Sequence, residues 1–246
     1  MAPPNPWVPY CGAGPLPGEL LARWNLDPVL ILGLGLAALI LWRRGSGARN
    51  THAWSALLVT LILFVSPLCA LSSALFAVRT AHHLALVVVL APLLARALPR
   101  QRAPNGTTLL LATLGSALVF WLWHAPSLYA WALSHDGAYW LMQISLVGTA
   151  TWFWRSLRSA ALLPSVAALL VAMVSMGLIA ALLTFAPTAF YAPHALTTMP
   201  WGLSPLEDQQ LAGLLMWVPG SLAYLAAALV LVARRLPADD RLRWAR

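Results

Sequence analysis

The chain has 246 residues, of which 61% are hydrophobic and only 9% are charged, and its formal net charge is +8. Its apolar runs recur with close to the roughly 20 residues that cross a bilayer, which excludes an ordinary soluble domain. All 15 basic residues are Arg and lie between the apolar runs. They are typical of membrane topology signals and do not indicate a nucleic-acid-binding surface.

Residues 1–24 are rich in Pro and Gly, and we expect them to form an extracytoplasmic tail. We expect no cleavable signal peptide, because no basic segment followed by an apolar core opens the chain. Cys11 lies in this tail and Cys69 lies inside an apolar run, so we predict that the two cysteines do not pair. Asp27 and Pro28 are typical of an N-cap followed by proline at the first helical position.

Seven apolar segments follow the tail, and they predict an all-α integral membrane protein with a seven-transmembrane-helix bundle over residues 25–236. The segments are 28–42, 53–78, 82–98, 108–125, 138–154, 162–185 and 208–233. Residues 237–246 would form a short basic cytoplasmic tail. Within the segments, Pro67, Pro92 and Pro219 should kink or locally open their helices.

The distribution of Arg predicts the orientation of this bundle. With the N-terminus outside and the C-terminus in the cytoplasm, 13 of the 15 Arg fall inside, and only Arg23 and Arg79 fall outside. One span more or fewer would scramble this count, so the positive-inside rule favours seven spans.

Five of the six histidines fall on the predicted outer side of the membrane. They are His82, His83, His124, His135 and His194. Imidazole, carboxylate and thioether groups together suit copper, with zinc or iron as alternatives. Because the histidines are far apart in the sequence, a site would be assembled across helices, and each of them has a structural interpretation as well. Adjacent His82 and His83 point about 100° apart, so at most one faces a given interior point.

Near the C-terminus, acidic and amide side chains lead directly into the last apolar segment. Carboxylates are stabilised at a helix N-terminus, so Asp208 is either a copper ligand or a cap of the last helix. Gly213, Met216 and Gly220 share one helical face, and the two glycines would let a neighbouring helix approach closely. Met216 is a thioether ligand candidate or a packing residue.

Three motifs resemble those of the multi-spanning CtaG-like cytochrome c oxidase assembly proteins, and the likeness runs over residues 25–235. The motifs are Phe120-Trp-Leu-Trp-His-Ala-Pro-Ser-Leu-Tyr129, Arg79-Thr-Ala-His-His83 leading to Ala91-Pro-Leu-Leu94, and Leu206-Glu-Asp-Gln-Gln-Leu-Ala-Gly-Leu-Leu-Met-Trp217. The resemblance implies a bacterial inner (plasma) membrane protein that helps to mature haem–copper oxidase and is linked to copper supply. It also implies cytochrome c oxidase subunits and periplasmic copper chaperones as partners.

The chain departs from this resemblance at two places. Many members carry a histidine one turn before the one matching His83, where this chain has Arg79. Many also carry a Glu-His pair early in the fifth span, where this chain has Met142 and Gln143. We therefore expect fewer bound metal ions, or Met142 as a softer substitute.

These observations predict a copper-handling assembly factor rather than an enzyme, since no nucleophile–base pair, phosphate loop or paired-Cys motif stands out. The candidate metal ligands are His82, His83, His124, His194, Asp208 and Met216. Two alternatives remain open at this point. One is a haem or quinone protein with His83 and His124 as axial ligands. The other is a metal-free chaperone that holds an unfinished oxidase subunit.

Overall fold

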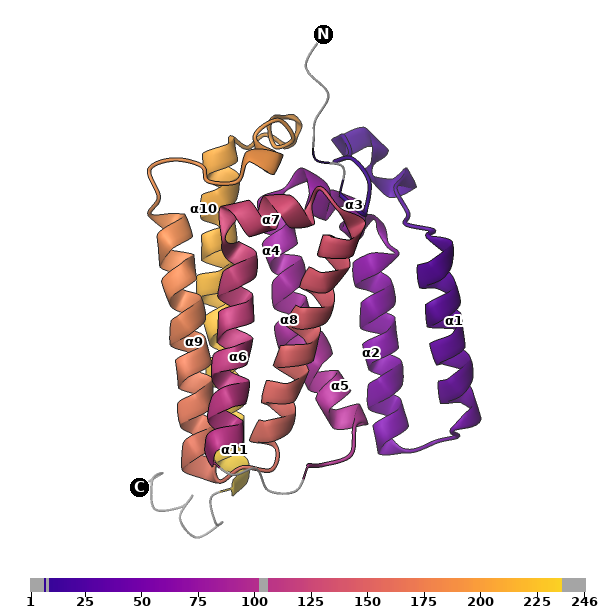
Figure 1. Cartoon of the computed structure of the whole chain (residues 1–246), viewed down its shortest axis with the longest axis vertical. Coiled ribbons are helices and arrows are strands. Elements are labelled where there is room, and N and C mark those ends of the chain that lie inside the picture. The colour runs from indigo at the N-terminus through magenta and orange to yellow at the C-terminus, as the bar shows by residue number, and fades with distance from the viewer. Residues whose placement is uncertain (1–6, 8, 102–105, 236–246) are drawn as a thin grey trace.

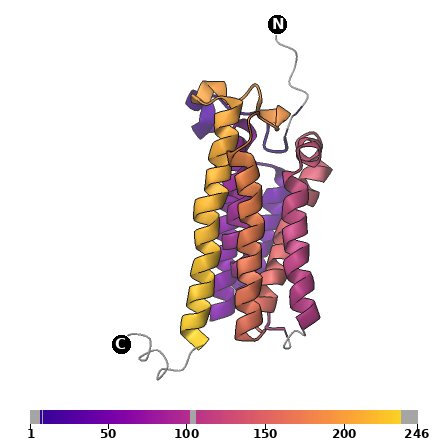
Figure 2. The same ribbon diagram turned by 90° about the vertical axis from the view of Figure 1, so that its left-hand side faces the viewer.

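The computed structural model of the chain describes residues 7, 9–101 and 106–235. These residues form helices and no strand, which confirms the all-α class. The long helices lie side by side in one bundle, with short helical elements at the end drawn uppermost in Figure 1. The view in Figure 2, turned by 90°, shows the same alignment and the same gathering of short elements at this upper end.

The first half of the chain supplies the elements from η1 to α5. They are η1 (Pro17–Ala22), α1 (Pro28–Arg43), α2 (Ala48–Phe64), α3 (Pro67–Ala74), α4 (Phe76–Ala85), the π-helical turn η2 (Leu86–Leu90) and α5 (Ala91–Ala97). The second half completes the bundle. Its elements are α6 (Gly106–His124), α7 (Pro126–Ala132), α8 (Asp136–Leu157), α9 (Leu162–Thr184), η3 (Ala192–His194), η4 (Met199–Trp201), α10 (Pro205–Leu215), the π-helical turn η5 (Met216–Gly220) and α11 (Ser221–Arg235).

Four continuous helical stretches in the described chain are long and apolar enough to cross a bilayer. They are Phe76–Ala97, Gly106–His124, Leu162–Thr184 and Pro205–Arg235. The pair α2 and α3, bent by 49°, would make a fifth. α1 is a shorter apolar helix, and α8 has 22 residues but does not reach the same hydropathy. Each of the seven predicted segments overlaps a helix, while the number of spans and the orientation of the termini stay predictions.

The three prolines that were predicted to disturb their helices break or open them, as expected. Pro67 begins α3 at the 49° bend, with the Ser66 side chain accepting a hydrogen bond from the Leu68 amide. Pro92 lies in the first turn of α5, two residues after the end of the π-helical turn η2, and Pro219 lies inside the π-helical turn η5. A proline has no amide hydrogen to donate, so the helix widens locally around it.

The predicted second and third spans are wrong in their boundaries. Residues 53–78 do not form one run, because the chain turns at Pro67 and α3 lies across the upper end of the bundle. The next long helix already begins at Phe76 instead of residue 82. His82 and His83 therefore lie in the second turn of this helix and not at its mouth.

Cys11 and Cys69 form a disulfide with their Cα atoms 5.4 Å apart, so the prediction that they stay unpaired is wrong. The bend before α3 is the reason, since it places Cys69 at the upper end of the bundle instead of half-way through a span. The N-terminal segment packs against this end closely. A Cβ atom on Gly14 would lie only 2.9 Å from the Cα atom of Ala74.

Candidate functional site

The amino end of α4 is capped by a carboxylate from a distant part of the chain. The first amides of a helix have no partner within the helix, and no side chain next to α4 in sequence supplies one. Asp208 is fully buried, and its two carboxylate oxygens accept hydrogen bonds from the amides of Phe76 at 2.6 Å and Ala77 at 3.0 Å. Both oxygens thus bind the amino end of α4, which gives Asp208 a structural role, while its role as a copper ligand stays a prediction.

The amino end of α10 is capped by residues at the start of α10 itself. The Ser204 hydroxyl accepts from the Glu207 amide at 3.2 Å, and the Glu207 carboxylate accepts from the Ser204 amide at 2.8 Å. This reciprocal pair is a capping box. The alternative that Asp208 caps its own helix is therefore wrong, because Asp208 caps α4.

The glycines of the last span hold it against its neighbours, as the shared face predicted. A Cβ atom on Gly213 would lie 2.3 Å from the Thr184 hydroxyl oxygen of α9. On Gly220 it would lie 2.6 Å from the Met176 sulfur of α9 and 3.3 Å from a methyl group of Leu84. Met216 lies between these two contact points and is fully buried, so its thioether faces the interior of the bundle.

His194 lies above α4, and both of its ring nitrogens have partners. Nδ1 lies 3.3 Å from the Ala74 carbonyl oxygen and Nε2 lies 2.6 Å from the Tyr129 hydroxyl. Nδ1–H therefore donates to Ala74, and Nε2 accepts from Tyr129. Burial lowers the pKa of His194 to about 3. The ring fastens the segment before α10 onto α3 and α7, and we leave it out of the candidate ligand set.

Three buried imidazoles lie next to one another inside the bundle, and we name His82, His83 and His124 the imidazole row. The ring centroids of His82 and His83 are 6.2 Å apart, and those of His83 and His124 are 5.8 Å apart. The row thus joins α4 to the end of α6 and brings His83 beside His124, two of the predicted ligands. His82 packs edge-on against Phe64 of α2, with ring centroids 5.0 Å apart.

The ring nitrogens of this row are short of hydrogen-bond partners. His124 Nδ1 lies 2.7 Å from the Phe120 carbonyl oxygen, so it is the protonated nitrogen and Nε2 keeps a free lone pair. Nε2 of His124, Nε2 of His83 and both nitrogens of His82 are buried without a partner. Most buried polar atoms are paired, so this cluster keeps nitrogen atoms that could bind a ligand or an ion.

Arg79 is a fully buried cation that sequence reasoning placed simply on the outer side. It lies one turn before His83 and so shares its helical face. Its Nη1 lies 3.4 Å from the Tyr139 hydroxyl, and its guanidinium lies 5.3 Å from the centre of the Tyr139 ring. Nε and Nη2 have no partner. The i, i+4 spacing to His83 was the signal that could have placed it here.

The remaining predicted residues divide between the interior and the surface. Met142 is fully buried, and Gln143 is 2% exposed with neither amide atom partnered. His135 is exposed. In the part of the chain that the structure describes, no three His, Cys, Asp or Glu side chains lie close enough to hold a metal ion. The arrangement therefore offers the imidazoles of His83 and His124, and the predicted thioether ligands Met216 and Met142 are both buried.

A family model described as cytochrome c oxidase caa3 assembly factor matches residues 34–237. This range runs from the second turn of α1 through the whole of α11, and it includes the imidazole row, Arg79 and Asp208. Comparisons with curated proteins and with solved structures found no match. Since the family model covers most of the 246 residues and agrees with the motifs, the chain belongs to the family of cytochrome c oxidase caa3 assembly factors.

Proposed function

We propose that this protein assists the assembly of cytochrome c oxidase by holding Cu(I) between His83 and His124 before the metal passes to an oxidase subunit. Family membership supports the assembly role. The observation that carries the copper role is the pair of buried Nε2 atoms without hydrogen-bond partners, on rings whose centroids are 5.8 Å apart. An imidazole nitrogen with a free lone pair is a good copper ligand.

The surroundings of the pair favour a singly charged and soft ion. The buried guanidinium of Arg79 repels a bound cation, and it repels a divalent ion twice as strongly as a monovalent one. The predicted thioether ligands Met216 and Met142, both fully buried, would also prefer Cu(I). A site with few ligands and a neighbouring positive charge holds its ion weakly, and weak holding suits delivery rather than storage.

Two features support the side of the membrane that we propose for the site. The Arg distribution favours an orientation with the upper end of the bundle outside the cytoplasm. The Cys11–Cys69 disulfide lies at the same end, and disulfides persist in oxidising compartments such as the periplasm. Both support a multi-pass protein of the bacterial inner membrane that takes copper on the periplasmic side, where periplasmic copper chaperones would supply it.

Copper retention by the purified protein tests this proposal. The protein is loaded anaerobically with Cu(I) and desalted, and the bound copper is compared with that of a His83→Ala/His124→Ala variant. We expect the double variant to lose the bound ion, whereas His135→Ala, which changes an exposed histidine, keeps it. Equal retention by wild type and double variant would remove the site, and a Soret band would favour the haem alternative.

A further inference from the structure

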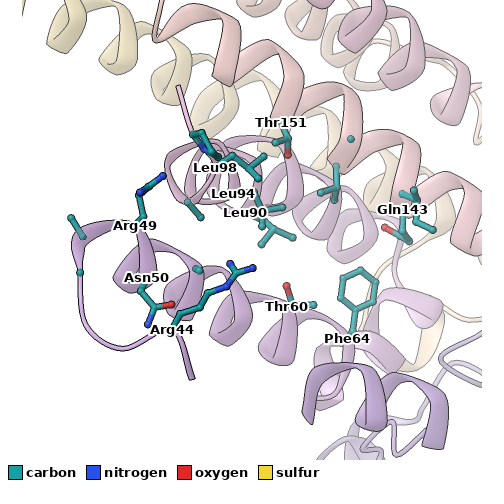
Figure 3. A pocket seen from close by; sticks show the side chains of 18 of the residues that line it. Arg44, Arg49, Asn50, Thr60, Phe64, Leu90, Leu94, Leu98, Gln143 and Thr151 are labelled. Atoms are coloured by element: carbon teal, nitrogen blue, oxygen red, sulfur yellow. The ribbon is translucent and has the colours of Figure 1, made fainter. Parts of the chain in front are cut away.

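A long groove opens on the side of the bundle between α2, α5 and α8 (Figure 3). Its volume is about 1170 Å³, which is above the roughly 300–1,000 Å³ of most small-molecule pockets. Arg44 and Arg49 lie at one end, and Phe64 and Gln143 lie at the other. α5 packs against both α2 and α8, and the groove separates these two helices beside it. This space suits a large, elongated ligand that enters from the side of the bundle.

The apolar walls of the groove have the length of one leaflet. Within the apolar segment of α2 the lining runs from Ala53 to Phe64, and on α8 it follows one helical face from Trp140 to Thr151. Each run covers 11 residue steps, about 17 Å at 1.5 Å per residue. The hydrocarbon core of a bilayer is about 30 Å thick, so one leaflet contributes about 15 Å. Both walls therefore match a hydrocarbon chain that belongs to a single leaflet.

The polar side chains along these walls give a polar occupant little to bind. The Thr60 hydroxyl already donates to the Ala56 carbonyl within α2, at 2.8 Å. The amide atoms of Gln143 and the hydroxyl oxygen of Thr151 are buried and present no surface to the groove. A polar side chain placed here would lose its hydrogen bonds to water, whereas a hydrocarbon chain has none to lose. The walls therefore favour an acyl chain over a helix with polar side chains.

Two arginines at the lower end of the groove have no partner in the described chain. Arg44 and Arg49 are exposed, and no hydrogen bond or ion pair joins either guanidinium to another described residue. Other arginines at this end are held by carbonyl oxygens, as Arg155 is by Pro99 at 3.0 Å. Since Arg44 and Arg49 line the groove, their donors remain available to an anionic group in it.

The surroundings of these two arginines add no negative charge. In the part of the chain that the structure describes, the acidic side chains all lie toward the opposite, upper end of the bundle (Figure 1). They are Glu19, Asp27, Asp136, Glu207 and Asp208. The amino end of α2 opens beside Arg49 with neither a side-chain cap nor an acidic residue in its first turn. Its amides add to the positive potential of the arginines.

We infer that this groove binds one anionic phospholipid, with an acyl chain along α2 and α8 and the phosphate at Arg44 and Arg49. Basic pockets between helices on the cytoplasmic side of a membrane bind lipid headgroups of this kind. The lower end of the bundle is the predicted cytoplasmic side, where the leaflet carries anionic lipids. The inference goes beyond the proposed copper role and does not depend on it.

A lipid in this position would attach the first two helices to the rest of the bundle. α1 packs against α2 at the edge of the bundle, and α2 packs against α5 (Figure 1). The groove leaves α2 apart from α8, and an acyl chain that contacts both fills this gap. Because a ligand that binds only the folded chain stabilises it, we expect the bound lipid to raise the unfolding temperature.

Native mass spectrometry of the purified protein tests the inference. The protein is stripped of lipid in detergent and mixed with dioleoyl phosphatidylglycerol or dioleoyl phosphatidylethanolamine, which differ in headgroup charge and not in chains. We expect one phosphatidylglycerol per molecule, held on the order of tenfold more tightly than phosphatidylethanolamine. Equal retention of the two lipids would contradict an anionic site.

Removal of the two arginines locates the headgroup. Arg44→Gln/Arg49→Gln is compared with Arg43→Gln/Arg234→Gln, which removes two exposed charges at the same end but outside the groove. We expect the first variant to bind the two lipids equally and the second to keep the tenfold preference. A preference that survives in the first variant would overturn the assignment.

A filled groove locates the acyl chain. Gly148→Leu places a side chain in the groove, and Gly177→Leu on α9 is the matched control, since open space surrounds both glycines. We expect Gly148→Leu to weaken retention of phosphatidylglycerol at least about tenfold, because it displaces several methylene groups. Gly177→Leu should change nothing. Unchanged retention in Gly148→Leu would show that the lipid binds elsewhere.

Photocrosslinking in cells distinguishes a lipid from a protein in the groove. A photoreactive phenylalanine analogue replaces Ile144, which lines the groove, or Val174, which is exposed on α9. We expect phospholipid adducts at both positions, enriched in phosphatidylglycerol at position 144. A polypeptide adduct at position 144 would mean that the groove receives a protein segment, contrary to the inference.

The copper-site variant separates this inference from the proposed function. We expect His83→Ala/His124→Ala to retain phosphatidylglycerol as wild type does, since the groove does not include the imidazole row. Retained lipid with unchanged copper retention would remove the copper site and leave the lipid site. Loss of the lipid in this variant would contradict a site formed by the groove alone.

Discussion

Two layers of buried polar groups at the upper end of the bundle differ in whether their atoms have partners. In the first, which we name the cap layer, Asp208 and His194 use both oxygens and both ring nitrogens in hydrogen bonds. In the imidazole row, one to two turns further along α4, four ring nitrogens have none. All five side chains are buried, and none is more than 7% exposed. Burial alone therefore does not separate the two layers, whereas their hydrogen bonding does.

The difference has an energetic meaning. Each buried polar group without a partner costs roughly 1–3 kcal/mol relative to a paired one. A chain that keeps several of them in one place gives up stability there, which is expected where a ligand completes the arrangement. The cap layer holds α4 in position, and α4 in turn positions His82 and His83 of the imidazole row. The following predictions test this division.

Removal of the Asp208 carboxylate should give the largest loss of stability. Asp208→Ala leaves the amides of Phe76 and Ala77 buried without acceptors, and we expect a loss of about 2–6 kcal/mol in unfolding free energy. Ser204→Ala removes an exposed cap and should cost only about 1 kcal/mol. Thermal unfolding in detergent, followed by tryptophan fluorescence, measures both.

Copper retention by the Asp208 variant decides whether the two layers are distinct. We expect Asp208→Asn, which keeps one acceptor oxygen, to bind as much Cu(I) per folded molecule as wild type. If copper is lost while the fold is kept, Asp208 belongs to the binding site after all.

Local rules of sequence were sufficient to predict much of the bundle. The apolar segments predicted the helices, Pro92 and Pro219 predicted the places where helices open, and Gly213 and Gly220 predicted a close contact with a neighbouring helix, which is α9. Each of these depends on a residue and its near neighbours along the chain. The proximity of His83 and His124 could also be predicted from the sequence, because both lie at the same end of adjacent spans.

Long-range geometry explains what sequence reasoning missed. Asp208 caps a helix that begins 132 residues earlier, and no local pattern shows which amino end a carboxylate will face. The Cys11–Cys69 disulfide depended on the direction of α3 after the bend at Pro67. The burial of Arg79 required knowing that its span begins at Phe76. In each case a few residues of error in a boundary moved a side chain to another environment.

The cap layer should also make the protein sensitive to acid. The pKa of His194 is about 3 in the folded chain and 6.5 ordinarily, so between these values the unfolded chain binds a proton that the folded chain does not. Stability is complete above pH 6.5 and falls as the pH decreases, by on the order of 2 kcal/mol at about pH 5. Unfolding temperatures at pH 7.5 and about 5 should converge in a His194→Gln variant. An equal pH dependence in that variant would show that other groups dominate.

The smallest expected effect concerns Arg79, and it tests the electrostatics of the imidazole row directly. Arg79→Gln keeps a hydrogen-bond donor near Tyr139 but removes the positive charge one turn from His83. We expect Cu(I) to be held about tenfold more tightly, which corresponds to about 1.4 kcal/mol, and to leave more slowly when a Cu(I) chelator is added. Tyr139→Phe, which removes only the hydroxyl, should change the release rate little. Faster release from Arg79→Gln would mean that the guanidinium orders the row rather than weakening its hold on the ion, and the labile site proposed for delivery would then need another origin.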